Sequence, residues 1–123
     1  MNQAIDPATI HDYHAHIYYD DRSREAAASI RERLQAAFTV EMGRWRDEPV
    51  GPHPQPMYQV KFGVAEFARI IPWLMLNRGE LTILVHPNTD DAYTDHAHNA
   101  LWLGGKLDLR LDILRELIQP ENR

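Results

Sequence analysis

The stretch Tyr13-His14-Ala15-His16-Ile17-Tyr18-Tyr19 holds the side chains best suited to chemistry. Aromatic and β-branched residues dominate it, which predicts a β-strand, and strand side chains alternate between the two faces of a sheet. His14, His16 and Tyr18 therefore share one face, while the residues between them form the apolar face that a core requires. Two imidazoles one pleat apart are two possible metal ligands. The pattern predicts a metal site on this face.

The remaining histidines, which could complete the site, stand at positions 11, 53, 86, 96 and 98. A single histidine is most often a hydrogen-bonded or surface residue, so the sequence assigns no function to His11 or His98. His53 or His86 could equally bond to backbone, and the pair Asp95-His96 could cap a helix. Only the spacing of His14 and His16 distinguishes a site from these structural alternatives.

The composition excludes several other kinds of site. Cysteine is absent from the 123 residues, which leaves His, Asp and Glu as the strong metal ligands. The net charge of -5, with scattered Lys and Arg, argues against nucleic-acid binding. The first ten residues lack an export signal, and the apolar run 70–76 is too short to span a bilayer, so we expect no membrane contact and a cytoplasmic location.

Hydrophobic periodicity predicts four strands and two long helices, with shorter helical segments after them, in one domain over residues 1–123. The strands are expected at 13–19, 39–46, 57–62 and 81–85, and the helices at 23–38 and 64–76. Residues 1–10 are expected to form a loose arm, 88–95 a polar loop and 96–103 a short helix. The pattern of 107–119 suits a strand or a helix, and we prefer a helix.

The order strand, helix, strand, strand, helix, strand predicts an α+β fold of the ferredoxin-like βαββαβ type with a C-terminal extension. In this sandwich both helices cover one face of an antiparallel four-stranded sheet, and the first strand lies between the third and the fourth. His14 then lies beside His86, and the proline-stiffened loop 48–56 could fold His53 over the open face. Lys61 would share that face. An open face with apolar neighbours is often covered by a second subunit, which predicts a homodimer.

Five motifs occur together in a fixed order along the chain. They are His14-Ala15-His16-Ile17-Tyr18, Gly51-Pro52-His53-Pro54, Leu76-Asn77-Arg78-Gly79, His86-Pro87-Asn88-Thr89, and Asp95-His96 followed by Leu103-Gly104. Over residues 11–104 this set resembles the DOPA 4,5-dioxygenase family. The resemblance implies a small α+β dimer in which a non-haem Fe(II) ion and O₂ open a catechol ring by extradiol cleavage.

Under this resemblance three histidines are the expected iron ligands: His14, His16 and His86. Zinc or nickel could replace iron in recombinant protein, because both bind such ligands more tightly. His53 is expected either as a substitute ligand or as an acid and base near the metal.

Further residues are expected to act on the substrate, a small aromatic catechol. His96 and Tyr18 join His53 as catalytic candidates, with Tyr18 donating a hydrogen bond to bound oxygen. Three basic residues could hold a substrate carboxylate: Lys61, Arg78 and Arg44.

One feature departs from the common Fe(II) oxygenase site, which contains two histidines and one carboxylate. None of Glu41, Asp12 or Asp95 has the strand parity that would place it clearly on the predicted face. Two alternatives therefore remain open. One is a dimeric protein of the same fold that binds a metal or an aromatic ligand without turnover. The other is a cofactor-free monooxygenase in which the histidines orient the substrate.

Overall fold

The computed structural model of the chain describes residues 3–118, which form one five-stranded sheet and four α-helices. The strands are β1 (Asp12–Tyr18), β2 (Glu41–Met42), β3 (Met57–Phe62), β4 (Ile83–Asn88) and β5 (Leu101–Leu103). The helices are α1 (Arg24–Ala37), α2 (Phe67–Asn77), α3 (Ala92–Ala97) and α4 (Leu111–Ile118), with 3-10 turns at Pro7–Thr9 and Val64–Glu66. The predicted α+β class is confirmed.

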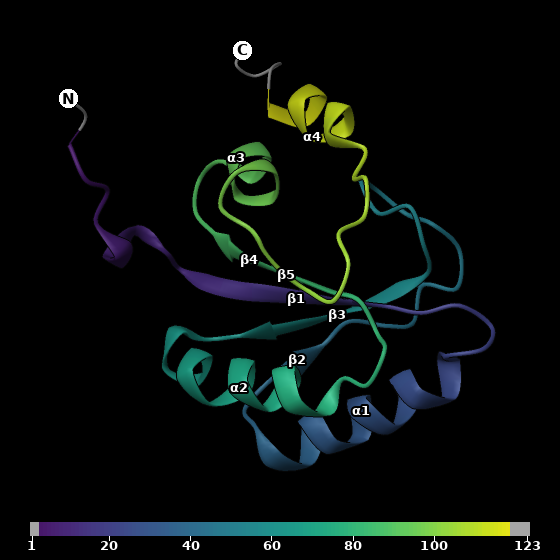
Figure 1. Cartoon of the computed structure of the whole chain (residues 1–123). Helices are drawn as coiled ribbons and strands as arrows, with labels where there is room; N and C mark the ends of the chain where they lie inside the picture. Colours follow the sequence, from purple (N-terminus) through teal and green to yellow (C-terminus); the bar gives the residue numbers. More distant parts are fainter. Residues whose placement is uncertain (1–2, 119–123) are drawn as a thin grey trace.

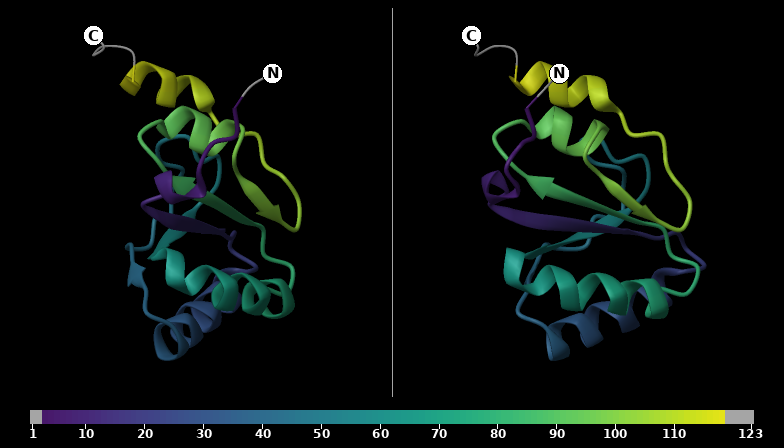
Figure 2. Two further views of the ribbon diagram at one scale, coloured as in Figure 1. Left: turned by 90° about the vertical axis from the view of Figure 1, so that its left-hand side faces the viewer. Right: turned by 60° about the vertical axis from the view of Figure 1, so that its left-hand side comes forward.

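The strand β1 lies at the centre of the sheet, whose order is β2-β3-β1-β4-β5. It pairs antiparallel with both β3 and β4, as the sequence predicted. In the ladder with β4, His14 lies directly opposite His86. The helices α1 and α2 pack on one face of the sheet, and α3 and α4 lie on the other (Figure 1 and Figure 2).

The face toward α1 and α2 holds the main core. Alternation places Ala15 and Ile17 of β1 in this core, and both side chains are fully buried. The helix α1 presents Ile30 and Leu34 to the same core from positions four residues apart, which lie on one face of a helix. Burying an aliphatic side chain of this size contributes about 1.5–3 kcal/mol. The hydroxyls of the buried tyrosines in this layer are satisfied, because Tyr58 donates to the Ala27 carbonyl over 2.7 Å and Tyr19 donates to Asp47 over 2.6 Å.

The opposite face is partly covered by the chain itself, which corrects the expectation of an open face. Tyr18, Met57 and Leu84 form a second buried cluster there, and Trp102 and Leu109 pack against it. Helix α3 forms where a polar loop was predicted, and β5 replaces part of the predicted short helix. Both are short elements without a repeating apolar pattern, so periodicity could not reveal them. The sheet therefore has five strands where four were predicted.

Other boundaries shift by less. The expected second strand at 39–46 contracts to β2 plus an isolated bridge between Arg46 and Met57. Residues 107–119 contain α4 over the described positions, in agreement with the preferred helix, and 119 lies outside the described residues. The expected loose arm contains a 3-10 turn, in which the Ala8 N–H donates to the Asp6 carboxylate. Over residues 3–118, no helix has the length and apolar character needed to cross a bilayer.

Candidate metal centre

Five histidines from four parts of the chain converge beside the sheet. They come from β1 (His14 and His16), β4 (His86), the proline-rich loop (His53) and α3 (His96). Alternation along β1 directs His14 and His16 away from the main core, and the β1–β4 register sets His86 beside them. The predicted parity of the strand is confirmed, and the three rings lie on one face.

Two sets of three histidines have ligand atoms close enough to hold one metal ion. The first set is His14, His16 and His86, and the second is His16, His53 and His96. Within each set the ligand nitrogens all lie within 4.8 Å of one another. The closest pair is His16 Nε2 and His86 Nε2, separated by 3.1 Å. His16 belongs to both sets, and its Nδ1 is buried without a hydrogen-bond partner.

Backbone carbonyls fix the protonation of two of these rings. His86 donates from Nδ1 to the Pro87 carbonyl over 2.9 Å, and His96 donates from Nδ1 to the Ala92 carbonyl over 2.8 Å. A carbonyl oxygen can only accept, so the proton of each neutral ring lies on Nδ1. The Nε2 atom of each ring therefore keeps its lone pair, which a metal ion or a proton can use.

His53 reaches the cluster because the rest of the chain holds its loop in place. The His53 N–H donates to the Val50 carbonyl over 3.1 Å, closing a turn. From the segment before α4, the Arg110 N–H donates to the Pro52 carbonyl over 2.8 Å. The ring of His53 then lies 4.1 Å from that of His16, and its Nδ1 lies 2.7 Å from the Tyr18 hydroxyl.

Burial keeps the cluster uncharged. Removal from water disfavours the imidazolium form, so it lowers the pKa of His86 to about 3 and that of His53 to about 4. The pKa of His16 falls well below its usual value for the same reason, and the neighbouring histidines lower it further. Burial also lowers the pKa of His14 and of His96. All five rings are thus neutral near pH 7, the form that binds metal.

Neither set includes a carboxylate. Asp95 is buried but accepts two hydrogen bonds from Thr89, one from its N–H at 2.8 Å and one from its hydroxyl at 2.7 Å. Asp12 accepts from Asn88 and lies 3.6 Å from the Lys61 ammonium. Asp95 and Asp12 therefore have other partners, Glu41 is exposed on β2 and belongs to neither set, and both sets consist of histidines alone.

Asp95 has a structural function that the sequence did not reveal. Thr89 directly follows β4 and Asp95 lies within α3, so the two hydrogen bonds tie α3 to the end of the strand. His96 is the next residue, and its ring lies 3.9 Å from that of His86. A threonine followed six residues later by an aspartate is too common a spacing to predict such a clamp.

We expect Asp95→Ala to lower the free energy of unfolding by about 2 kcal/mol, because it leaves two part-buried donors of Thr89 without acceptors. Urea denaturation of the metal-free protein measures this change. Asp95→Asn is the matched control, since its amide can accept from the Thr89 N–H and donate to the Thr89 hydroxyl. Equal losses of unfolding free energy in the two variants would contradict a stabilising function of the hydrogen bonds between Asp95 and Thr89.

The three basic residues predicted for substrate binding have different surroundings. Lys61 lies opposite His14 in the β1–β3 ladder, on the histidine face. Arg44 lines a small pocket of about 140 Å³ together with Gln59, the ladder partner of His16. Arg78 lies away from the cluster and donates to the carbonyls of Gly79 and Leu81.

The contacts of Arg78 explain two of the sequence motifs. Gly104 has a φ of +83°, and a Cβ atom there would come within 2.9 Å of the Arg78 guanidinium. Only glycine accepts both the backbone angle and this contact without strain. The Leu103-Gly104 motif, at the end of β5, therefore packs against the turn that the Asn77-Arg78-Gly79 motif forms between α2 and β4.

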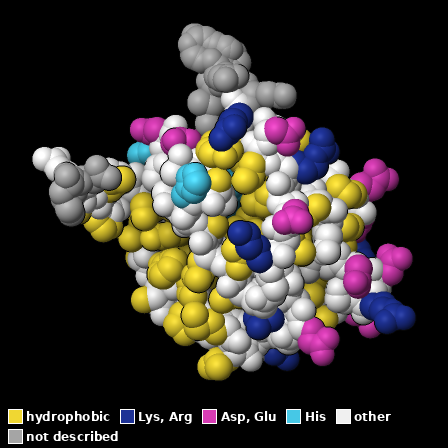
Figure 3. Space-filling view, turned by 45° about the horizontal axis from the view of Figure 1, so that its top comes forward, with side chains coloured by type: hydrophobic (Ala, Val, Ile, Leu, Met, Phe, Trp, Pro, Cys, Tyr) yellow, Lys and Arg dark blue, Asp and Glu magenta, His cyan; other side chains and the backbone are white. Residues whose placement is uncertain are grey.

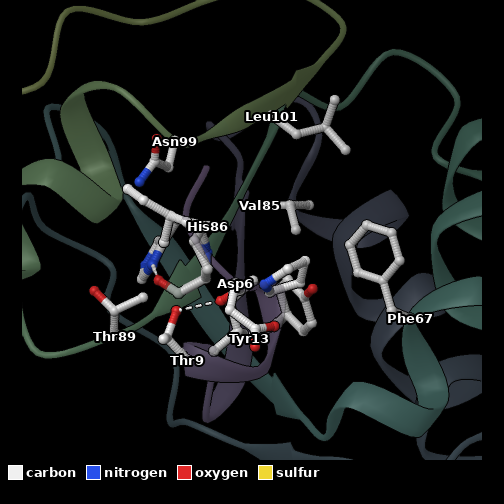
Figure 4. A pocket seen from close by; sticks show the side chains of 13 residues that line it. Asp6, Thr9, Tyr13, Phe67, Val85, His86, Thr89, Asn99 and Leu101 are labelled. Carbon is white, nitrogen blue, oxygen red and sulfur yellow. Dashed lines mark hydrogen bonds between the residues drawn. The ribbon is translucent and has the colours of Figure 1, made fainter. Parts of the chain in front are cut away.

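Little of the histidine cluster reaches the molecular surface. His16, His53 and His86 are all at most 5% exposed. The face that carries α4 shows mainly apolar and charged side chains with small areas of histidine (Figure 3). A largely apolar pocket of about 400 Å³ lies beside β4, where Tyr13 and Phe67 face the N-terminal arm and His86 is one of the lining residues (Figure 4).

Three comparisons with known proteins each find a relative or a family that is named as a dioxygenase. A family model described as the Dopa 4,5-dioxygenase family matches residues 13–113. An uncharacterized 21.2 kDa protein of Botryotinia fuckeliana is 38% identical over 121 positions, which cover 89% of this chain and 66% of that protein. A DOPA 4,5-dioxygenase of Amanita muscaria is 33% identical over 118 positions, which cover 89% of this chain and 52% of that protein. The chain thus spans less than two thirds of both relatives.

A solved structure is similar along nearly the whole chain. It is a crystal structure of a "putative dioxygenase" from Nostoc punctiforme, 53% identical in sequence. The TM-score is 0.92, and the match covers 93% of this chain and 99% of that one.

Proposed function

The chain belongs to the Dopa 4,5-dioxygenase family, and on this premise we propose that it is a non-haem Fe(II)-dependent extradiol dioxygenase acting on a DOPA-like catechol. The observation that supports the proposal most is the set His14, His16 and His86, whose ligand nitrogens lie within 4.8 Å of one another. Family membership supports a dioxygenase. The metal, the cleavage position and the substrate are parts of the proposal.

The donor set fits a divalent transition metal. Three neutral imidazoles suit iron, zinc and nickel alike, and one face of the ion would remain open to other ligands. Bound Fe(II) would supply adjacent positions for both catechol oxygens and for O₂. Without a carboxylate ligand, the two negative charges of a fully deprotonated catechol would balance the charge of the ion.

The residues around the metal set can handle the substrate protons. A catechol must lose protons to bind through both oxygens. His96 can accept one at Nε2, because its Nδ1 proton is engaged with the Ala92 carbonyl. Its pKa is lowered by burial, so the ring is neutral and able to accept near pH 7.

Substrate would approach along the histidine face from the side of β3, since α3 packs beside β4. Lys61 is the ladder partner of His14, and Arg44 lines a pocket with Gln59, the ladder partner of His16, so both are our candidates for holding a carboxylate. Arg78 is less suited to this function, since its guanidinium is engaged in the turn before β4. The predicted homodimer rests on the resemblance alone, because the chain itself covers much of the face that a partner was expected to cover.

Binding without turnover is the second candidate function, and the all-histidine cluster favours it. Anaerobic loading with Fe(II), followed by O₂ uptake with a panel of catechols, separates the two. We expect one iron per chain, O₂ consumption and a yellow ring-opened product. Zinc-loaded protein is the control and should consume no O₂.

Other results would identify the alternatives. Stoichiometric iron without O₂ uptake for any catechol would contradict the dioxygenase and favour a binding function. Oxygen uptake by protein that retains no iron would instead favour the cofactor-free monooxygenase.

A further inference from the structure

We propose that Tyr18 is a positioning residue that keeps the proton of His53 on Nε2. His53 then stays off the metal and donates a hydrogen bond into the site. The inference rests on the proposed function, since it assumes a metal in the histidine cluster. It assigns Tyr18 a different function from the predicted hydrogen bond to bound oxygen.

The contact between the two residues is short and buried. The Tyr18 hydroxyl lies 2.7 Å from His53 Nδ1. Tyr18 is 1% exposed and His53 is 5% exposed. Among the described residues, the Tyr18 hydroxyl has no other hydrogen-bond partner.

Chemistry decides the direction of this hydrogen bond. A tyrosine hydroxyl is protonated near pH 7, and its proton needs an acceptor. A buried donor left without an acceptor costs about 1–3 kcal/mol. Donation from Tyr18 to the Nδ1 lone pair avoids this cost, and a neutral imidazole with a lone pair on Nδ1 carries its proton on Nε2.

His53 thereby differs from two other rings of the cluster. The Nδ1 atoms of His86 and His96 face the carbonyls of Pro87 and Ala92, which can only accept, so each of these rings keeps its lone pair on Nε2. His53 faces a donor and has the opposite tautomer. An N–H group cannot bind a metal, so the set His16, His53 and His96 lacks one of its three ligands. The set of His14, His16 and His86 is unaffected.

Packing prevents the phenol from moving away. The Tyr18 ring stacks on Trp102, with centroids 6.1 Å apart and planes 16° apart. Met57 and Leu84 complete the cluster around it. On the other side, the hydrogen bond from Arg110 to Pro52 restrains the loop of His53.

The assigned tautomer gives His53 a chemical function. A neutral N–H group directed into a buried site stabilises negative charge on a neighbouring oxygen. A catechol bound through deprotonated oxygens has such charge. His53 would donate this hydrogen bond, while His96 accepts a proton, so the two rings have complementary functions.

The test is ¹⁵N NMR of the imidazole nitrogens in intact protein, first without metal and then loaded with ¹¹³Cd. We expect wild-type His53 to show the Nε2–H tautomer in both states and no ¹⁵N–¹¹³Cd coupling. In Tyr18→Phe the preference for this tautomer should fall at least tenfold. Tyr13→Phe is the matched control, because Tyr13 lies on the same strand, stacks on Phe62 and faces the main core. It should leave His53 unchanged.

Two results would overturn the inference. They are an Nδ1–H tautomer at wild-type His53 and cadmium coupling to its Nε2. The metal-free spectrum separates this failure from that of the proposed function. A protein that binds no cadmium but retains the Nε2–H tautomer would support the assignment of Tyr18 and contradict the metal centre.

Discussion

Replacing His16 with alanine should remove stoichiometric metal from the protein while the fold persists. His16 is the one histidine shared by both three-histidine sets, so neither set retains three ligands without it. Changes in residues that merely orient a ligand reduce metal affinity 10- to 100-fold, so losing a ligand should reduce it by more than about 100-fold. Metal analysis after anaerobic Fe(II) loading measures the retained iron, and cobalt titration measures the affinity.

The fold should survive this change. In the native protein the His16 ring already carries a buried nitrogen, Nδ1, that has no hydrogen-bond partner, and the substitution removes this unfavourable group. His98→Ala is the matched control, since His98 lies at the end of α3, packs against Tyr93 and belongs to neither set. It should retain one metal per chain. Equal metal content in the two variants would remove His16 from the site. Loss of metal in His14→Ala but retention in His53→Ala would identify the first set as the ligands.

The metal-free protein should lose much of its stability between pH 7.5 and pH 5. The pKa of a histidine is about 6.5 in an unfolded chain, whereas burial lowers the pKa of His53 to about 4 and that of His86 to about 3. Well above the unfolded pKa of about 6.5, these rings are neutral in both states and do not make stability depend on pH. As the pH falls below 6.5, the unfolded chain binds protons that the native protein does not, and stability falls until the pH reaches the folded pKa values.

The expected loss of unfolding free energy is large relative to the total stability of a small domain. Each of these two rings should reduce the free energy of unfolding by about 2 kcal/mol at pH 5, and His16 should add to the loss, whereas a domain has only about 5–15 kcal/mol in total. Urea denaturation in the presence of a chelator, at both pH values, measures the change. Bound metal should reduce the loss by stabilising the native state.

His53→Gln tests whether the cluster causes this dependence. Glutamine has no titrating group, so the difference between the two pH values should shrink by about 2 kcal/mol. His11→Gln is the control, because His11 is exposed and lies outside both histidine sets. An unchanged pH dependence in His53→Gln would show that other groups cause the acid sensitivity.

Strand parity made much of the site predictable. Alternation along β1 placed His14 and His16 on one face, and the order of elements placed β1 between β3 and β4. His86 followed from the same reasoning, because an antiparallel ladder sets the end of β4 beside the start of β1. These conclusions depend on local periodicity, which can be read from a sequence, and on the small number of strand orders that a given succession of elements allows.

The elements that cover the histidine face could not be predicted from strand parity. Helix α3 and strand β5 are too short to show a period, and what holds them is contacts between distant residues. The pairing of β5 with β4 is an example, and the hydrogen bond from Arg110 to Pro52 is a similar long-range contact that restrains the loop of His53. The engagement of Arg78 in a turn against Gly104 likewise depends on a three-dimensional approach.

By itself, the sequence determined the fold class, the family motifs and the three histidines on neighbouring strands. Only the tertiary structure decided which partner each imidazole has: a carbonyl for His86 and His96, a phenol for His53. The physical reason is that a strand period of two residues fixes the direction of a side chain. The hydrogen bonds that set a tautomer, and the burial that sets a pKa, arise only when loops and helices far apart in sequence close over the sheet.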